Sequence, residues 1–372
     1  MKKICLIGPA APYRGGIAQH LTLFDKHLRE AGFDVLLVSF RRQYPRLLFG
    51  RSDVDPASQP YHNQTEYLID SLNPVSWRSA AKRIGDWRPD VVIIPWWTPF
   101  WAPVWTSMAK NIKRRCPQSR LIFLCHNVLP HESRFFDKAA LRIALRRADG
   151  FVVHAEAERP KLERFFPKSS ILVSPHPTYA QIGRAASLHD FQRPSAENII
   201  LFCGIVRYYK GLDILLKALA LLETKVHLYV VGDFWEDAAV YEQQVAEFGL
   251  TAQVTIVNQY VPDDVLAGYV RLADVVVLPY RNATQSGVAQ LALGHGTPVI
   301  TTDVGGLAEV VSHKHTGLVI PPQNPKELAK AIDYFFANPD QIEFVANIKR
   351  DQKRFSWRTF VGNVNRFVKE MD

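Results

Sequence analysis

Two cations, Arg207 and Lys210, lie in a short segment that separates an apolar run from an amphipathic pattern. The segment begins at Gly204, directly after the run Ile199–Cys203, and ends at Gly211. This order predicts a strand, a tight turn and a helix. A helix N-terminus attracts anions through its free N–H groups and its dipole, and two added cations favour a diphosphate. The alternative is an ordinary loop with two solvated cations.

A second predicted strand, Val275–Leu278, also runs into the start of a helical pattern, here at Ser286 and Gly287. Backbone N–H groups at such a start are expected to meet a phosphate. Gln285 and Gln290 are polar side chains at the same place.

The N-terminal half has two comparable positions. Gly15 and Gly16 follow the first apolar run and open a helical pattern, where glycines permit close approach of a phosphate or sugar. A tight turn is the alternative. His126 directly follows the predicted strand Leu121–Leu124 and Cys125, and a side chain at the carboxyl end of a parallel strand points into the ligand crevice. A histidine that is merely satisfied by hydrogen bonds is the other interpretation.

Two further segments carry aromatic or basic side chains that suit an acceptor or a membrane. The first holds Arg41, Arg42, Arg46 and Arg51 among Leu47, Leu48 and Phe49, a mixture that suits an anionic lipid surface. The second holds Trp96, Trp97, Trp101 and Trp105, and indoles suit both carbohydrate stacking and membrane interfaces. Some of these rings are expected to close the core instead.

Composition narrows the class of protein. The chain has 372 residues and a formal net charge of +9, which favours an anionic partner such as a phosphorylated substrate or an acidic membrane. No zinc finger or basic heptad region is found, so a nucleic acid is not expected. No apolar run is long enough to span a membrane. The four cysteines are scattered without metal-ligand spacing, which indicates reduced thiols in a cytoplasmic protein: Cys5, Cys116, Cys125 and Cys203.

Short Val- and Ile-rich runs alternate with helical patterns through both halves of the chain. Such runs are typical of parallel strands that are buried on both faces, so the sequence predicts an α/β protein with two doubly wound, Rossmann-like domains. We expect an N-terminal domain at 1–178, a Pro-containing linker at 179–197, a second domain at 198–350, and a terminal segment at 351–372; the family resemblance described next implies that the first domain binds the acceptor and the second the nucleotide sugar.

In their order along the chain, the glycine pair, the His126 loop, the Arg207/Lys210 turn and the Ser286–Gly287 helix start resemble the motifs of family 4 retaining glycosyltransferases. The resemblance implies the GT-B fold, with a cleft between the two domains and a terminal helix that returns to the N-terminal domain. It also implies that Gly204 and Tyr260 lie near the donor, and that Glu309 contacts the donor or caps its helix. In many members an arginine directly follows the glycine of the basic motif, whereas Ile205 stands there in this chain.

One departure from the family concerns a pair of glutamates. Aligning on the segment Gly296-Thr-Pro-Val299 puts Ala283 and Leu291 at their positions, so both carboxylates are missing and Gln285 and Gln290 are the nearby polar substitutes.

The family's chemistry implies a retaining, metal-independent hexosyltransferase that moves a sugar from a nucleotide-sugar donor to a glycan or lipid-linked acceptor, in bacterial surface polysaccharide or glycolipid synthesis. His126, Arg207 and Lys210 are its expected catalytic residues, and no cofactor or metal is expected. The expected location is the cytoplasm, with peripheral attachment to the inner membrane left open. The alternatives are a non-catalytic sugar-nucleotide binder, a GT-B epimerase and, most distantly, a nucleic-acid binder.

Overall fold

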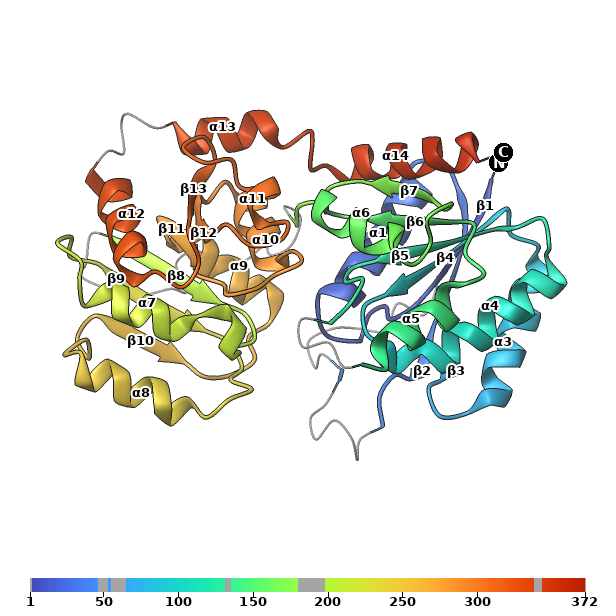
Figure 1. Cartoon of the computed structure of the whole chain (residues 1–372), viewed down its shortest axis with the longest axis horizontal. Helices are drawn as coiled ribbons and strands as arrows, with labels where there is room; N and C mark the ends of the chain where they lie inside the picture. Colours follow the sequence, from blue (N-terminus) through green and yellow to red (C-terminus); the bar gives the residue numbers. More distant parts are fainter. Residues whose placement is uncertain are drawn as a thin grey trace. The chain divides into compact units, whose positions relative to one another are not determined.

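The computed structural model describes residues 2–45, 53–54, 65–130, 135–179, 198–337 and 343–371. The chain divides into two compact units (Figure 1). Unit 1 comprises Met1–Pro175 together with Trp357–Asp372, and unit 2 comprises His176–Ser356. The expected linker lies almost wholly outside the described residues.

Unit 1 is built on a seven-stranded parallel sheet with the order β3-β2-β1-β4-β5-β6-β7. Its central strands are continuously apolar and buried, as strands covered on both faces must be. The strands are β1 (Lys3–Ile7), β2 (Asp34–Arg42), β3 (Thr65–Asp70), β4 (Val91–Trp96), β5 (Arg120–Cys125), β6 (Gly150–Val153) and β7 (Ser170–Val173).

Helices cover both faces of this sheet. Helices α3, α4 and α5 lie side by side on one face, while α1 contacts the C-terminal helix α14 (Figure 1). The bounds are α1 (Gly16–Glu30), α3 (Pro74–Trp87), α4 (Ala102–Arg115), α5 (Asp137–Leu145), α6 (Arg159–Glu163) and α14 (Trp357–Glu370), with short 3₁₀ turns η1 (Pro99–Trp101) and η2 (Glu156–Glu158).

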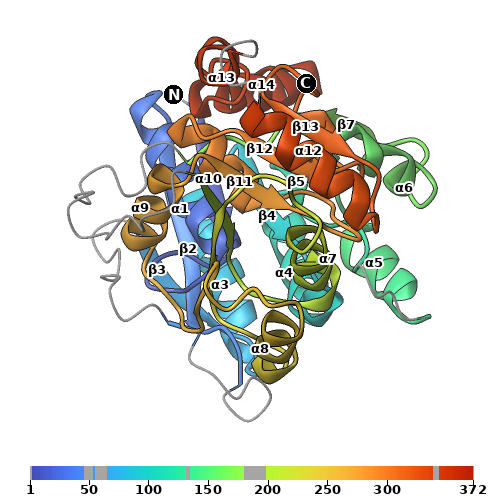
Figure 2. The ribbon, with the colours of Figure 1, turned by 90° about the vertical axis from the view of Figure 1, so that its left-hand side faces the viewer.

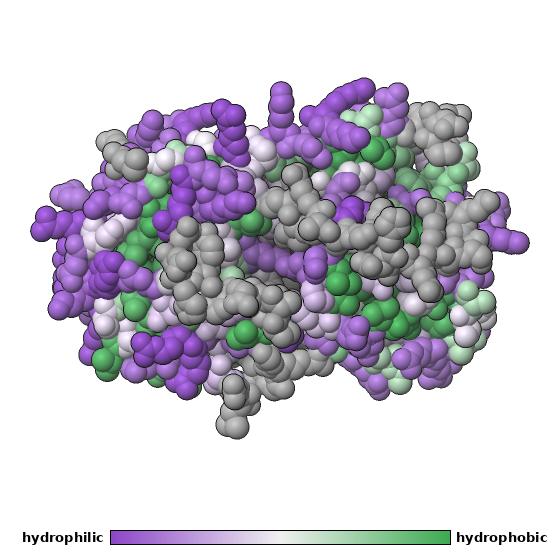
Figure 3. Space-filling view, turned by 180° about the vertical axis from the view of Figure 1, so that it is seen from behind, coloured by the Kyte–Doolittle hydropathy of each residue, from purple (hydrophilic) through white to green (hydrophobic). Residues whose placement is uncertain are grey.

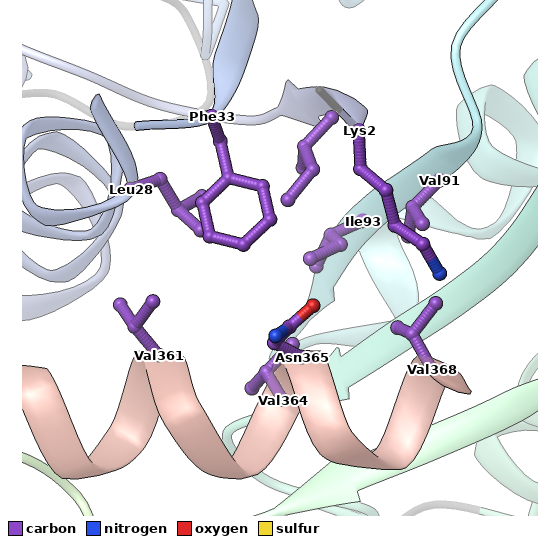
Figure 4. A pocket seen from close by; sticks show the side chains of 10 residues that line it. Lys2, Leu28, Phe33, Val91, Ile93, Val361, Val364, Asn365 and Val368 are labelled. Atoms are coloured by element: carbon purple, nitrogen blue, oxygen red, sulfur yellow. The ribbon is translucent and has the colours of Figure 1, made fainter. Parts of the chain in front are cut away.

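The C-terminal helix α14 belongs to unit 1 because one of its faces is apolar. Its buried residues recur at helical spacing: Trp357, Phe360, Val361, Val364, Phe367 and Val368. Figure 4 shows Val361, Val364 and Val368 facing Leu28 and Phe33 across a small apolar pocket. The Arg120 guanidinium also donates a 2.6 Å hydrogen bond to the carbonyl of Met371.

Unit 2 repeats the architecture with six parallel strands in the order β10-β9-β8-β11-β12-β13. Helix α7 contacts α8 and α12, and α9 contacts α10, so helices again lie on both faces (Figure 2). The strands are β8 (Ile199–Cys203), β9 (His227–Val231), β10 (Val254–Val257), β11 (Val275–Leu278), β12 (Val299–Thr302) and β13 (Gly317–Ile320). The helices are η4 (Tyr208–Lys210), α7 (Leu212–Leu219), α8 (Ala238–Glu247), α9 (Asp263–Leu272), α10 (Gly287–His295), α11 (Leu307–Val310), α12 (Pro325–Ala337) and α13 (Phe344–Asp351).

The predicted fold class is confirmed, and the sequence prediction omitted one strand. Strand β3 lies at the edge of its sheet, where it pairs only with β2. Its apolar run is only the three residues Tyr67–Ile69, with an acidic residue on either side, and four of its six residues are only half-buried, so it lacks the longer buried run of the central strands. Hydrophilic side chains project from the face of the molecule drawn in Figure 3, with smaller hydrophobic areas among them. Among the described residues, no helix is long and apolar enough to cross a membrane.

Candidate functional site

In unit 2 the loops after β8 and β11 meet at the point where the strand order reverses. Strands β8 and β11 are neighbours in the sheet, although their following connections lead to opposite sides of it. In open parallel sheets, ligands bind outside the carboxyl ends of strands at such a point. Both loops carry residues that the sequence had singled out, so this is the candidate binding site.

Gly204 opens the first of these loops at a positive φ of 89°. A Cβ at this position would lie 3.1 Å from the Lys210 Nζ and 3.2 Å from Cγ2 of Val288. The absence of a side chain therefore lets the Lys210 amine lie close to the backbone of Gly204. The same glycine lies against the first turn of α10, so the cation and the helix N-terminus are neighbours.

Lys210 is the electrostatic centre of the site. Its side chain is 8% exposed, and no carboxylate among the described residues pairs with it. Its Nζ lies 5.6 Å from the ring centroid of Tyr280. Burial lowers the pKa of Lys210 to about 8; Cys203 raises it and the Arg207 charge lowers it further. A buried cation without a counter-ion is costly, and a bound anion would relieve that cost.

Arg207 lies on the same loop but is exposed, with its guanidinium 5.3 Å from the ring centroid of Trp235. Trp235 follows β9, so an aromatic side chain from a neighbouring strand end holds this second cation. Sequence analysis identified Arg207 but not the ring that orients it.

Arg281 anchors the loop, and sequence analysis missed it. Its guanidinium makes two hydrogen bonds, of 2.9 and 2.7 Å, with the carboxylate of Asp213 and donates another of 2.7 Å to the Tyr208 carbonyl. The Arg281 backbone N–H donates to Tyr209 at 2.7 Å. These contacts join the β11 loop to the β8 loop. The cation directly after Tyr280 was visible in the sequence, but its partners lie far away along the chain.

The start of α10 supplies donors and polar side chains. Ser286 caps the helix, since its Oγ accepts a 3.3 Å hydrogen bond from the Ala289 N–H, and Gly287 is the first helical residue. Gln290 is 1% exposed, and neither polar atom of its side chain has a hydrogen-bond partner in the described part of the chain. Buried polar groups are normally satisfied, so this carboxamide suits contact with a bound ligand or water. Gln285 is half-buried beside the cap.

The remaining predicted donor residues lie at other strand ends of unit 2. Tyr260 follows β10 and is half-buried, and Glu309 lies on α11 and is also half-buried. Ala283 and Leu291, which the sequence analysis aligned with the family's glutamates, are both buried. Gly305 packs against the carbonyl of Ala283, where a Cβ would lie 1.7 Å from that oxygen.

Unit 1 has its own reversal of strand order, between β1 and β4. Gly15 and Gly16 lie in the loop and first turn that follow β1, and no atom lies within 4 Å of where a Cβ would be at either residue. Both are exposed, so a ligand can approach their backbone closely.

His126 lies at the end of β5 and is buried among two further histidines. Its ring centroid is 4.9 Å from that of His20 and 5.2 Å from that of His154. The sequence analysis named only His126. His154 directly follows β6, the neighbour of β5, so its position at an adjacent strand end was an available signal. The Nδ1 of His154 lies 3.0 Å from the carbonyl of Ser174, which fixes the proton on that nitrogen.

The structure corrects the expectation for two tryptophans. Trp96 and Trp101 are fully buried in the core of unit 1, together with Trp105, so their rings are not available to an acceptor or a membrane. Trp97 is half-buried and donates a 3.2 Å hydrogen bond from its Nε1 to the hydroxyl of Tyr44. The physical reason is that the segment packs between the sheet and α4, where large rings fill the core.

The expected basic segment is only partly described. Arg41 is exposed, and Arg42 forms a bidentate ion pair with Asp70, with contacts of 2.8 and 2.7 Å from its Nη2. Arg46 and Arg51 lie outside the described residues, as do His131 and Glu132 of the loop after His126.

Comparison with known proteins agrees with this geometry. Residues 14–178 match the family described as "Glycosyltransferase Family 4", and residues 197–338 match "Glycosyl transferases group 1". A sucrose-phosphate synthase from Thermosynechococcus elongatus has the same fold, with a TM-score of 0.76 and 21% identity, covering 100% of this chain and 99% of that one. The HepE protein of Anabaena, solved in complex with UDP, has a TM-score of 0.72 and 19% identity over all of both chains.

Curated relatives match shorter segments. A D-inositol 3-phosphate glycosyltransferase of Jonesia denitrificans is 33% identical over 172 residues, which cover 43% of this chain and 40% of that protein. An uncharacterized glycosyltransferase of Methanocaldococcus jannaschii is 30% identical over 164 residues, with 43% and 42% coverage. The matches therefore span less than half of the length of these relatives.

The two parallel sheets with their covering helices define the GT-B fold. Within that fold class, the chain belongs to glycosyltransferase family 4.

Proposed function

We propose that this chain transfers a sugar from a nucleotide-sugar donor to a hydroxyl group of an acceptor, with retention of the anomeric configuration and without a metal. The observation that carries the proposal is the buried, unpaired Lys210 beside Gly204 and the N-terminus of α10. A diphosphate is the anion that such an arrangement suits, because helix N–H groups and two cations converge on it.

In the proposed reaction, the bond between the anomeric carbon and the diphosphate oxygen breaks while the acceptor oxygen bonds to the same carbon on the same face. The acceptor's proton passes to the leaving phosphate, so no enzyme nucleophile is required. Arg207 and Lys210 stabilise the negative charge that develops on the diphosphate. His126 is the proposed contact to the reacting sugar.

Donor and acceptor classes follow from the relatives and from the charge of the chain. Similar structures were solved with UDP and with UDP-glucose, so uridine nucleotides are the first donors to test. A galactosyltransferase of the lipopolysaccharide outer core also shares the fold, with a TM-score of 0.72 and 13% identity. This structural likeness and the net charge of +9 favour a glycan or lipid-linked acceptor, in bacterial surface polysaccharide or glycolipid synthesis. The proposed place of transfer is the cytoplasmic side of the inner membrane.

The second candidate is a sugar-nucleotide binder without turnover. It is favoured by Ala283 and Leu291, two buried apolar side chains where the family carries glutamates. Binding of a donor without release of the nucleoside diphosphate would identify this function.

A thermal-shift screen of nucleotide sugars followed by a turnover assay tests the proposal. A ligand at about 100 times its dissociation constant adds roughly 2.7 kcal/mol of stability. With the donor so identified, Arg207→Ala and Lys210→Ala should each lower transfer by roughly 10²–10³-fold. Lys217→Ala, which removes a cation from the adjoining α7, is the control and should leave transfer nearly unchanged. Normal transfer in both loop variants would contradict the assignment.

A further inference from the structure

Helix α5 exposes a stripe of residues with helical spacing that mixes cations with apolar side chains. Phe135 is 92% exposed and Ile143 is 50% exposed. The opposite face of the helix packs into the core through Leu141 and Leu145. The α5 stripe consists of Phe135, Lys138, Ala139, Arg142, Ile143 and Arg146, all exposed and each three or four residues from another member. Phe135 lies in the turn just before the helix and Arg146 is its C-cap, so these two extend the stripe beyond the helix at either end.

The stripe carries no acidic side chain. The acid of α5, Asp137, is buried, and no carboxylate within the described ranges pairs with Lys138, Arg142 or Arg146. Arg142 lies over the ring of Phe165, with its Cζ 5.5 Å from the ring centroid. The stripe therefore presents positive charge to solvent.

The neighbouring helix extends the positive charge. Helix α4 contacts α5 and contains no acidic residue, and it exposes Lys110, Arg114 and Arg115 (Figure 1). Helix α3, the next in the layer, exposes Arg78 and Lys82. Cations thus predominate on the outer side of these three helices, although α3 also exposes Asp86 and the apolar Val75.

We infer that the α5 stripe docks unit 1 on the surface of an anionic membrane. Phenylalanine and isoleucine interleaved with cations along one helix face suit a layer of anionic headgroups above acyl chains. Long basic side chains reach the headgroups while the apolar ones enter the boundary beneath them. An acidic protein partner would need only the cations of the stripe. It would not explain why a phenylalanine ring is almost wholly exposed beside them.

This surface differs from the segment that the sequence suggested. Of the two described arginines of that segment, Arg42 is already engaged by Asp70. The α5 stripe combines free cations with an exposed aromatic ring, so it meets both requirements of an interfacial helix.

Sedimentation of the full chain with vesicles tests the inference, without donor or acceptor. One set of vesicles is pure phosphatidylcholine and the other contains added phosphatidylglycerol. Binding should require the anionic lipid and should fall as salt is raised, because exposed charges are screened. The triple variant Lys138→Gln, Arg142→Gln, Arg146→Gln should bind roughly 10- to 100-fold more weakly.

Matched variants separate this surface from general charge and hydrophobicity. The control triple Lys225→Gln, Lys326→Gln, Lys349→Gln removes the same charge from exposed positions of unit 2 and should bind as the wild type does. Phe135→Ser with Ile143→Ser should also weaken binding, whereas Leu221→Ser with Val240→Ser, at comparably exposed sites of unit 2, should not. Thermal unfolding checks that each variant remains folded.

Equal loss of binding in stripe and control variants, or no binding to the anionic vesicles, would overturn the inference. The inference would also be overturned if the charge variants still bound to neutral vesicles. The inference goes beyond the proposed transfer reaction, and the vesicle assay uses no nucleotide sugar. A protein that binds vesicles through α5 without transferring a sugar would leave this inference standing and remove the proposed function.

Discussion

Lys210 shows how a single residue connects stability with binding. Its ammonium group is buried without a carboxylate partner in the described chain, and burial lowers its pKa to about 8. A buried charge that has lost its hydration destabilises the ligand-free protein, and it favours the binding of an anionic ligand. On the proposed function, relief of this desolvation cost would contribute part of the free energy of donor binding.

Replacing Lys210 with methionine should therefore stabilise the ligand-free protein by about 1–3 kcal/mol at neutral pH. The pKa of this lysine is near 8 in the folded chain and lies above that when unfolded, near 10.5. The unfolded state thus binds more protons between these values, so wild-type stability rises with pH through this window and the advantage of the variant disappears. Denaturant unfolding of the wild type and the variant at pH 7 and pH 10 measures the added stability at neutral pH and its loss at high pH. A variant that is less stable than the wild type at pH 7 would show that the cation is already compensated.

On the proposed function, His126 acts on the reacting sugar rather than on the nucleotide. Its buried ring lies against His20 and His154, which restrict its orientation. We expect His126→Ala to lower kcat by roughly 10²-fold and to change donor affinity much less. Steady-state kinetics and donor titration measure the two effects, with His227→Ala in unit 2 as the control. An equal loss of nucleotide binding would place His126 elsewhere in the mechanism.

At the scale of elements, the site depends on how two loops are joined. Arg281 follows β11, and it binds Asp213 of α7 and the carbonyl of Tyr208 in the β8 loop. Both members of the ion pair are mostly buried, with 14% and 16% of their side chains exposed. The pair therefore positions the Arg207/Lys210 loop by contacts that water screens only weakly.

Arg281→Ala should cost about 2–4 kcal/mol, because it removes both short hydrogen bonds to the mostly buried Asp213 carboxylate and leaves only Lys217, at 3.9 Å. Arg350→Ala is the matched control: its pair with Glu343 is exposed at 68% and 67%, so its loss should cost no more than about 0.5 kcal/mol. Chemical denaturation measures both variants. Equal, small effects would show that the Arg281 pair does not hold the loop.

At the scale of the whole molecule, the proposal assigns to two cations the work that a metal performs in other transferases. Transfer should therefore persist in excess EDTA, since Arg207 and Lys210 neutralise the leaving diphosphate. A donor assay with and without the chelator measures this, with dialysed enzyme as the control for metal carried over from purification. Loss of transfer on chelation, restored by magnesium or manganese, would contradict the metal-free mechanism.

The sequence by itself determined the class of fold and the loops that bear the site. Strands buried on both faces need continuous apolar runs, and such runs mark twelve of the thirteen strands in the part of the chain that the structure describes. Because ligands bind at the carboxyl ends of parallel strands, Gly204, Lys210 and His126 could be singled out from their positions alone. These are local signals, and a linear sequence carries them completely.

Only the tertiary structure decided which side chains meet. Arg281 and Asp213 are separated by more than sixty residues, and the histidines at 20, 126 and 154 come from three distant segments. Strand β3 and the tryptophans misled sequence reasoning for the same reason. Strand β3 lies at the edge of its sheet, so it lacks the long apolar run by which strands were predicted. Trp96 and Trp101 are buried because their rings pack in the core of unit 1. Burial is a property of all the elements that surround a residue, so it is decided when the sheet orders its strands and the helices cover them.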